Sequence, residues 1–360
     1  MPPGSDRGLS EATWVALLTL PAAISVPVYF ILGNVTWIFA VIWGFATLAS
    51  VLLVYAVRRS GDDWRREWKL LFYLALALGI ISIVTGFGNN ATDEPFTMNA
   101  YLGLLLSGQD PYVTWVNVTF TAHVLNIWSN TVSAPYTYVY LPLGLFLQVP
   151  GTGAIGYRSL CLACWVGIVY LVRKHEFAVI CMVSPTVVLV AANGFTDLPA
   201  LLLCTFALFG PGGWIGTASE YCSYGTKQFA VAFWFVYHLL RKQWLKAGLV
   251  ILITLAWVAP FLVWHPYGVW CEALTLGEGP GCQNALSSTR HISDLWSHWN
   301  YYLWILWVYA LFHTTINRWI LRAWSTFRGP GRSPSNPKVP TPMPLAGGAD
   351  VRDDATAPVH

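Results

Sequence analysis

The sequence predicts an all-α membrane protein with about 10–11 transmembrane or re-entrant helices. Of its 360 residues, 56% are hydrophobic and 10% are charged, whereas soluble domains carry about 25% charged residues. The chain also contains 20 Trp and 17 Tyr residues, two types that concentrate at membrane–water interfaces. The net charge of +3 and the lack of a nucleic-acid-binding motif argue against DNA or RNA partners. Membrane lipids are the expected surroundings.

Apolar runs of about 17–25 residues, long enough to cross a bilayer, define the clearest helices. They cover residues 12–32, 35–57, 69–87, 245–264 and 301–321. Between residues 136 and 240 the apolar runs are shorter and interrupted by Pro and Gly, so we expect several of them to be bent or half-spanning. These shorter segments are 136–150, 155–172, 177–193, 197–211, 213–225 and 228–240.

Lys and Arg residues in short loops predict the orientation, because they favour the cytoplasmic side of a membrane. Basic clusters lie within residues 58–69, 241–246 and 318–332. They place both termini in the cytoplasm and loops 88–135 and 265–300 outside it, in a plasma membrane or the endoplasmic reticulum. We interpret residues 136–150 as a re-entrant segment, which brings residues 193–197 to the outer side as well.

Three parts are expected along the chain. Residues 1–66 hold two transmembrane helices and a basic cytoplasmic loop, and residues 67–325 form a larger transmembrane module. Residues 326–360 form a cytoplasmic tail that is predicted to be disordered, because it has almost no large apolar residues. The N-terminus lacks the basic region and cleavage site of a secretory signal, so we expect the first apolar run to be a retained helix.

The adjacent carboxylates Asp93 and Glu94 form the first candidate site. They follow directly on the apolar run 69–87, in an external loop that is otherwise poor in acids. Residues 96–106 can form a short interfacial helix with an apolar face, ended by Gly108. Two interpretations stand: the acids cap this helix, or one of them is a general base in a partly dry cleft.

Four further residues are candidates, each with a structural alternative. Asp197 interrupts an apolar stretch and is either a helix N-cap or a functional acid. Lys227 lies among aromatic residues and either extends to the interface or contacts a lipid phosphate. Arg290 and His291, in loop 265–300, are either ordinary solvated residues or a pair that grips a phosphate or diphosphate.

The cysteines divide into two groups. Cys271 and Cys282 share loop 265–300, and a disulfide between them is expected if this loop lies outside the cytosol. The other five lie in or beside apolar runs and are interpreted as small core residues. They are Cys161, Cys164, Cys181, Cys204 and Cys222.

The order of these features resembles the GT-C superfamily of integral-membrane glycosyltransferases, which use polyprenyl-phosphate-linked sugars. The nearest branches are the mannosyltransferases and the protein O-mannosyltransferase-like enzymes. The resemblance covers about residues 69–265. Its motifs are the external acids, GQDPY (108–112), YVYLPL (138–143), NGFTD (193–197), GTKQF (225–229) and APF (259–261).

This resemblance implies an enzyme that moves a hexose such as mannose from a polyprenyl-phosphate donor to an external glycan, lipid or protein acceptor, with inversion. It gives Asp93 the role of general base and Glu94 that of a helper or metal contact. Asp197 matches the second acidic position, and Lys227 matches the lysine that contacts the lipid phosphate. The resemblance leaves open whether a divalent metal such as Mg²⁺ or Mn²⁺ takes part.

The tyrosine-containing motifs receive binding roles from the same resemblance. The GQDPY element, with Asp110 and Tyr112, is expected to shape the acceptor side. Tyr138 and Tyr140 belong to a tyrosine–proline segment in which the usual double proline is replaced by Leu141-Pro142.

Two other classes of function stay open. A lipid or sugar transporter or flippase would use broken helices and intramembrane acids as a translocation path, although we see no inverted repeat in the sequence. A non-catalytic membrane scaffold would use the carboxylates as helix caps.

Overall fold

The computed structural model describes most of the chain between residues 37 and 271 and short pieces outside it. The described residues are 15–16, 19, 37–59, 64–85, 94–114, 116–124, 128–136, 138, 140–151, 153–271, 303–309, 311–312, 315–316 and 319. The chain divides into two compact units, residues 1–311 and 312–360. All labelled helices and strands belong to the first unit.

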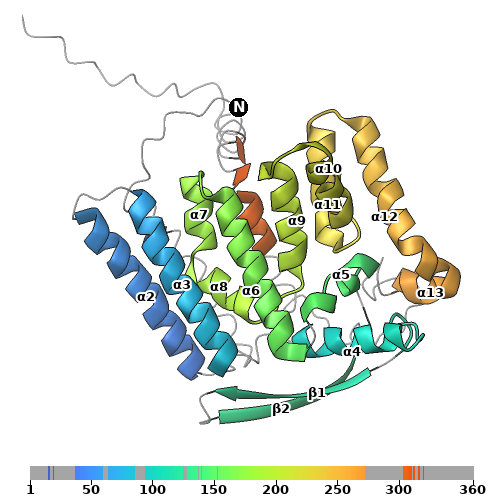
Figure 1. Cartoon of the computed structure of the whole chain (residues 1–360), viewed down its shortest axis with the longest axis horizontal. Helices are drawn as coiled ribbons and strands as arrows, with labels where there is room; N and C mark the ends of the chain where they lie inside the picture. The colour runs from blue at the N-terminus through green and yellow to red at the C-terminus, as the bar shows by residue number, and fades with distance from the viewer. Residues whose placement is uncertain are drawn as a thin grey trace, which may run out of the picture. The chain divides into compact units, whose positions relative to one another are not determined.

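The first two labelled helices are α2 (Trp37–Arg59) and α3 (Trp64–Thr85), close to the predicted segments 35–57 and 69–87. They lie side by side, coloured blue in Figure 1. Their outer faces carry exposed apolar side chains, including Phe45, Leu52 and Val84, as expected for lipid-facing helices. The opposite face of α3 packs closely on its neighbours, since a Cβ atom at Gly79 would lie 2.8 Å from Leu162.

Helix α4 (Glu94–Leu106) occupies the stretch where the sequence predicts a helix over residues 96–106. It ends at Gly108, whose φ of +76° is the left-handed conformation that glycine adopts at helix C-termini. The backbone N–H of Gln109 donates to the carbonyl of Leu104 over 2.9 Å and closes the last turn.

A β-hairpin follows α4, in a loop for which no strand is predicted. Strands β1 (Val116–Val124) and β2 (Trp128–Tyr136) pair antiparallel, from Val116 opposite Tyr136 to Val124 opposite Trp128. The sequence of β1, VNVTFTAHV, alternates apolar and polar residues, which is the signal of a two-faced strand. The otherwise helical class of the fold is confirmed.

Residues 136–150, interpreted as re-entrant, form no spanning helix. They contain the five-residue helix α5 (Pro142–Phe146), followed by the 3-10 turn η1 (Val149–Gly151). Five residues of helix extend about 7.5 Å, a quarter of the hydrocarbon thickness of a bilayer. The next helix, α6 (Gly153–Val172), is long, and it packs against α4 and η1; Figure 1 shows α4 near its first turns.

The predicted segment 177–193 is broken in the structure. Helix α7 (Glu176–Met182) ends before Pro185, which starts the short helix α8 (Pro185–Ala192), because the residue before a proline disfavours helical dihedrals. Helix α9 (Asp197–Phe209) then leaves at a bend of 118° from α8.

The remaining helices are α10 (Gly213–Ser223), α11 (Gln228–Leu240), α12 (Trp244–Trp264) and the short α13 (Pro266–Val269). They follow the predicted segments closely, except for α13, which lies in the predicted loop 265–300. Among the described residues, α6 and α12 are long and apolar enough to cross a membrane, and the bent pair α8–α9 would be a third span if counted as one. The predicted total of 10–11 segments stays a prediction.

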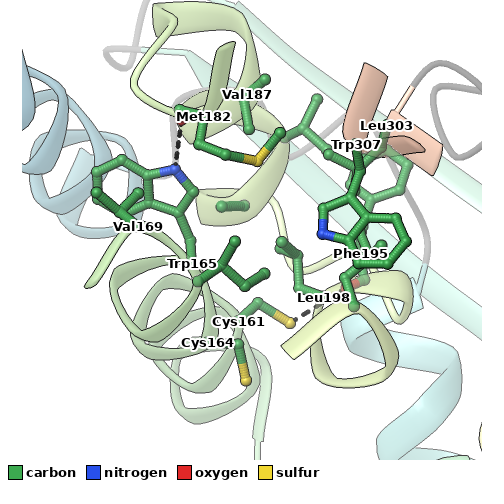
Figure 2. Packing of buried hydrophobic residues seen from close by; sticks show 14 of the residues in the cluster. Cys161, Cys164, Trp165, Val169, Met182, Val187, Phe195, Leu198, Leu303 and Trp307 are labelled. Atoms are coloured by element: carbon green, nitrogen blue, oxygen red, sulfur yellow. Dashed lines mark hydrogen bonds between the residues drawn. The ribbon is translucent and has the colours of Figure 1, made fainter. Parts of the chain in front are cut away.

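The core lies where α6 packs against α8 and α9. Figure 2 shows Trp165 of α6 donating its indole N–H to the carbonyl of Met182 over 2.7 Å. Cys161, one turn earlier, donates to the carbonyl of Phe195 over 3.4 Å, in the loop between α8 and α9. The four cysteines at positions 161, 164, 181 and 204 are buried and are not disulfide-bonded.

Candidate functional site

A buried ion pair joins the start of α9 to the start of α11. Lys227 Nζ lies 2.7 Å from Asp197 Oδ2, and both side chains are buried. Asp197 is the first residue of α9, where the helix dipole favours a negative charge. The N-cap position itself belongs to Thr196. The acid and the lysine singled out in the sequence therefore meet across 30 residues of chain.

Three more side chains contact this pair. The indole N–H of Trp304 donates to Asp197 Oδ1 over 2.6 Å, and Lys227 donates to the hydroxyl of Thr196. Lys227 Nζ also lies 4.1 Å from the centre of the Tyr140 ring, a cation–π contact. Both carboxylate oxygens of Asp197 thus have a donor.

The YVYLPL and GQDPY motifs are held against each other next to the ion pair. The Tyr112 hydroxyl donates to the carbonyl of Tyr140 over 2.7 Å, and the backbone N–H of Tyr138 donates to the carbonyl of Pro111 over 3.1 Å. The rings of Tyr112 and Tyr138 meet edge to face with centroids 5.2 Å apart. The ring of Phe261, from the APF motif in α12, also meets Tyr112 edge to face, with centroids 5.4 Å apart.

A backbone contact ties the YVYLPL motif to the GTKQF motif. The N–H of Leu143 donates to the carbonyl of Gly225 over 2.9 Å. Gly144 lies so close that a Cβ atom there would be 2.8 Å from the carbonyl oxygen of Thr226, so a side chain at this position would push against the residue before Lys227. The structure thereby brings together Asp110, Tyr112, Tyr138, Tyr140, Asp197 and Lys227.

Asp110 is a buried carboxylate in which one of the two oxygens accepts a hydrogen bond from a described residue. Its Oδ1 accepts the backbone N–H of Tyr112 over 2.8 Å, while Oδ2 is buried without a hydrogen-bond partner among the described residues. Burial raises the pKa of this carboxyl above its ordinary value of 3.8, and the Tyr112 N–H and the nearby His265 oppose the rise. A group of this kind is suited to bind a cation or a hydroxyl of a ligand.

The remaining predicted site residues lie outside this geometry. Asp93, Arg290, His291 and Cys282 are not among the described residues. Glu94 is the first residue of α4, and its side chain is outside the described part as well. Cys271 is disulfide-bonded, and its pairing with Cys282 stays a prediction.

The described part of the chain offers no cluster of three or more metal-ligating side chains. Asp93 and Glu94, the candidate ligands for Mg²⁺ or Mn²⁺, lie outside that search. A divalent metal therefore stays a prediction.

Sequence reasoning missed three residues. Trp304 and Thr196 contact the ion pair, and Trp304 gave no local signal because it is 107 residues from Asp197. Arg158 is buried inside α6. Its signal was present, since it is a single charge inside the predicted apolar segment 155–172, and such residues are functional candidates by default.

A second buried polar cluster lies at the other end of α11. The carboxylate oxygen Oε1 of Glu220 accepts from the Tyr224 hydroxyl over 2.5 Å and lies 2.9 Å from His238 Nε2. The other ring nitrogen of His238 lies 2.9 Å from Gln243 Oε1. Lys227 and His238 are 11 residues apart, about 16 Å along a helix, so this cluster joins α10 to α11 and is separate from the ion pair.

Comparison of the chain with protein-family models, with curated proteins and with solved structures gives no match. The site geometry and the motifs therefore carry the functional argument.

Proposed function

We propose that the chain is a membrane glycosyltransferase that moves a hexose, such as mannose, from a polyprenyl-phosphate donor to an acceptor outside the cytoplasm. The observation that carries the proposal is the meeting of five sequence motifs around one buried ion pair. Residues of GQDPY, YVYLPL, NGFTD, GTKQF and APF contact one another through the bonds described above. These are the motifs on which the resemblance to the GT-C superfamily rests.

The proposed reaction needs one base and one site for the departing phosphate. The oxygen of the acceptor hydroxyl attacks the anomeric carbon, and its proton passes to the carboxylate of Asp93. The bond between the anomeric carbon and the phosphate oxygen breaks, and the polyprenyl phosphate leaves with the electron pair. Attack from the face opposite the phosphate inverts the anomeric centre.

Lys227 has a defined place in this proposal. An ammonium carries three N–H donors, and two of them serve Thr196 and Asp197. The ammonium nitrogen also lies 4.1 Å from the centre of the Tyr140 ring, and we propose that Lys227 contacts the phosphate when that ring moves aside. Tyr140 is accordingly proposed as the residue that responds to donor binding.

The test uses the release of polyprenyl phosphate, which requires no knowledge of the acceptor. Membranes containing the wild-type chain are supplied with radiolabelled polyprenyl-phosphate mannose or glucose, and free polyprenyl phosphate and labelled product are separated by chromatography. The variant Asp93→Asn should release polyprenyl phosphate about 10²–10⁴-fold more slowly, the usual contribution of a general base. Asp63→Asn, in the predicted cytoplasmic loop, is the matched control and should stay within about twofold.

Three outcomes separate the classes of function. Equal release by wild type and Asp93→Asn, or product with retained anomeric configuration, would remove Asp93 as the base. Movement of intact donor across the membrane without cleavage would favour a transporter, whose broken helices the bent α8–α9 pair resembles. If neither cleavage nor movement of the donor is observed, the non-catalytic scaffold is the remaining class.

A further inference from the structure

Arg158 is the charged residue on an otherwise apolar, buried stripe of α6. The stripe is formed by positions 158, 161, 165, 169 and 172, which share one helix face by their spacing of three or four residues. Arg158 is 2% exposed, and the other four positions are 1% exposed or less. The long side chain of arginine often reaches out to an interface, but that of Arg158 is enclosed by protein.

Two contacts locate Arg158 relative to α4 and to the loop between α8 and α9. Five residues before it, about 7.5 Å along the helix axis, the N–H of Gly153 donates to the side chain of Asn99 in α4 over 3.2 Å. Three residues after it, about 4.5 Å further along, Cys161 donates to Phe195 of the NGFTD motif. Arg158 therefore lies at the same end of α6 as α4 and the α8–α9 loop.

The donors of Arg158 that lack a partner form one edge of the guanidinium group. Nε and Nη2 are buried without a hydrogen-bond acceptor among the described residues. The N–H bonds of these two nitrogens point the same way and form the parallel pair that binds two oxygens of one anion. None of the salt bridges formed by described residues includes Arg158.

A buried arginine without an anion is strongly destabilising, so this edge requires an oxyanion. The position favours a phosphate group. Arg158 lies three residues inside the apolar span Ile155–Val172, close to the boundary between hydrocarbon and headgroups where lipid phosphates lie. Ile155, one turn before it, is 68% exposed, so the covered stripe reaches the surface within one turn of Arg158.

A second unpartnered polar atom lies in the same neighbourhood. Asn193 is 2% exposed, and its Oδ1 is buried without a hydrogen-bond partner among the described residues. It caps the C-terminus of α8 two residues before Phe195, whose carbonyl contacts Cys161, three residues after Arg158 in α6. The amide of Asn193 can present either its oxygen or its N–H₂ group, and the latter would donate to a further oxygen of the same anion.

We propose that Arg158 binds a phosphate group through its Nε–Nη2 edge, with Asn193 as an additional contact. The phosphate belongs either to a lipid headgroup or to a soluble phosphate, and the shared chemistry is a group with at least two adjacent anionic oxygens. The inference concerns binding alone and does not require sugar transfer.

The test measures binding to the full-length protein in dodecyl maltoside, a detergent without phosphate. Farnesyl phosphate, inorganic phosphate and farnesol are each titrated by calorimetry. Wild type should bind farnesyl phosphate, and Arg158→Lys should weaken this binding about tenfold or more, because lysine keeps the charge but loses the two-pronged edge. Arg173→Lys is the matched control next to the opposite end of α6, where the guanidinium rests on the Tyr170 ring, and it should change affinity less than about twofold.

The outcomes decide both the inference and the source of the phosphate. If farnesyl phosphate binds and inorganic phosphate does not, the site belongs to a lipid headgroup. If both bind, the site accepts phosphate in general. Equal affinities of wild type and Arg158→Lys, or no binding of either phosphate, would overturn the inference. If Arg158→Lys does not fold, the unfolding temperature of wild type is measured instead. A rise with a phosphate probe but not with farnesol supports the inference, and no rise with either phosphate overturns it. Binding without sugar transfer would count against the proposed enzyme only.

Discussion

Breaking the buried ion pair between Lys227 and Asp197 should destabilise the protein far more than removing a surface charge. The two charged atoms are 2.7 Å apart, so at an effective dielectric constant of about 20 their attraction is about 6 kcal/mol. Much of this attraction offsets the cost of removing both groups from water. Replacing one partner keeps the cost of the other, which leaves a net loss of about 3–5 kcal/mol for Lys227→Met.

The double variant shows whether this loss comes from the pair. In Lys227→Met the carboxylate of Asp197 keeps its bond to Trp304 but has lost its cation. Adding Asp197→Asn removes the charge that was left alone, so the double variant should be more stable than Lys227→Met by at least about 1–2 kcal/mol. The exposed Lys246 serves as the control, and Lys246→Met should change stability by less than about 0.5 kcal/mol.

The buried free cysteines provide the assay. Cys181 and Cys204 are fully buried, so a thiol-reactive dye labels them when the helices separate. Labelling is followed in dodecyl maltoside against rising dodecyl sulfate. The unfolding free energies of wild type, Lys227→Met, Asp197→Asn, the double variant and Lys246→Met are compared. A loss below about 1 kcal/mol for Lys227→Met, or losses that simply add in the double variant, would refute the reasoning.

Two further predictions concern the same region. Asp110→Asn removes a carboxyl whose pKa is raised by burial. In wild type, the stability that the protonated carboxyl contributes is complete below pH 3.8 and is lost as the pH rises through the raised pKa. The variant has no such loss, so its unfolding temperature minus that of wild type should increase from about pH 4 to about pH 8. A difference that stays constant with pH would contradict this. Gly144→Ala places a Cβ atom 2.8 Å from the Thr226 carbonyl and should cost about 1–3 kcal/mol of unfolding free energy. Gly103→Ala, in a helix with open space around it, should be neutral or stabilising by up to about 1 kcal/mol, and equal effects of the two substitutions would argue against the close contact.

Local signals in the sequence predicted most of the helices and their ends. Segment 245–264 became α12 (Trp244–Trp264), and segment 228–240 became α11 (Gln228–Leu240), because the length of an apolar run and its flanking residues act within the segment. Gly108 ends α4 for the same local reason. The hairpin was missed although VNVTFTAHV alternates cleanly, since a search by length of apolar runs does not detect a two-faced strand.

The candidate site depended on contacts between distant segments. The sequence showed Asp197 and Lys227 as isolated charges with plausible structural roles, and only the tertiary structure pairs them across 30 residues and adds Trp304 from 107 residues away. The same holds for Arg158. In the sequence it is one charge in an apolar run, and in the structure two of its buried nitrogens have no hydrogen-bond partner among the described residues. Asp93, Arg290 and His291 remain predictions from the sequence.

The sequence by itself determined a helical, strongly apolar chain, the limits of most helices and the order of its motifs, and it predicted a membrane protein. The tertiary structure alone decided which side chains are buried and which charges meet. The physical reason is that hydrophobicity and turn propensity are properties of neighbouring residues, whereas the cost of a buried charge depends on whichever group the fold places beside it.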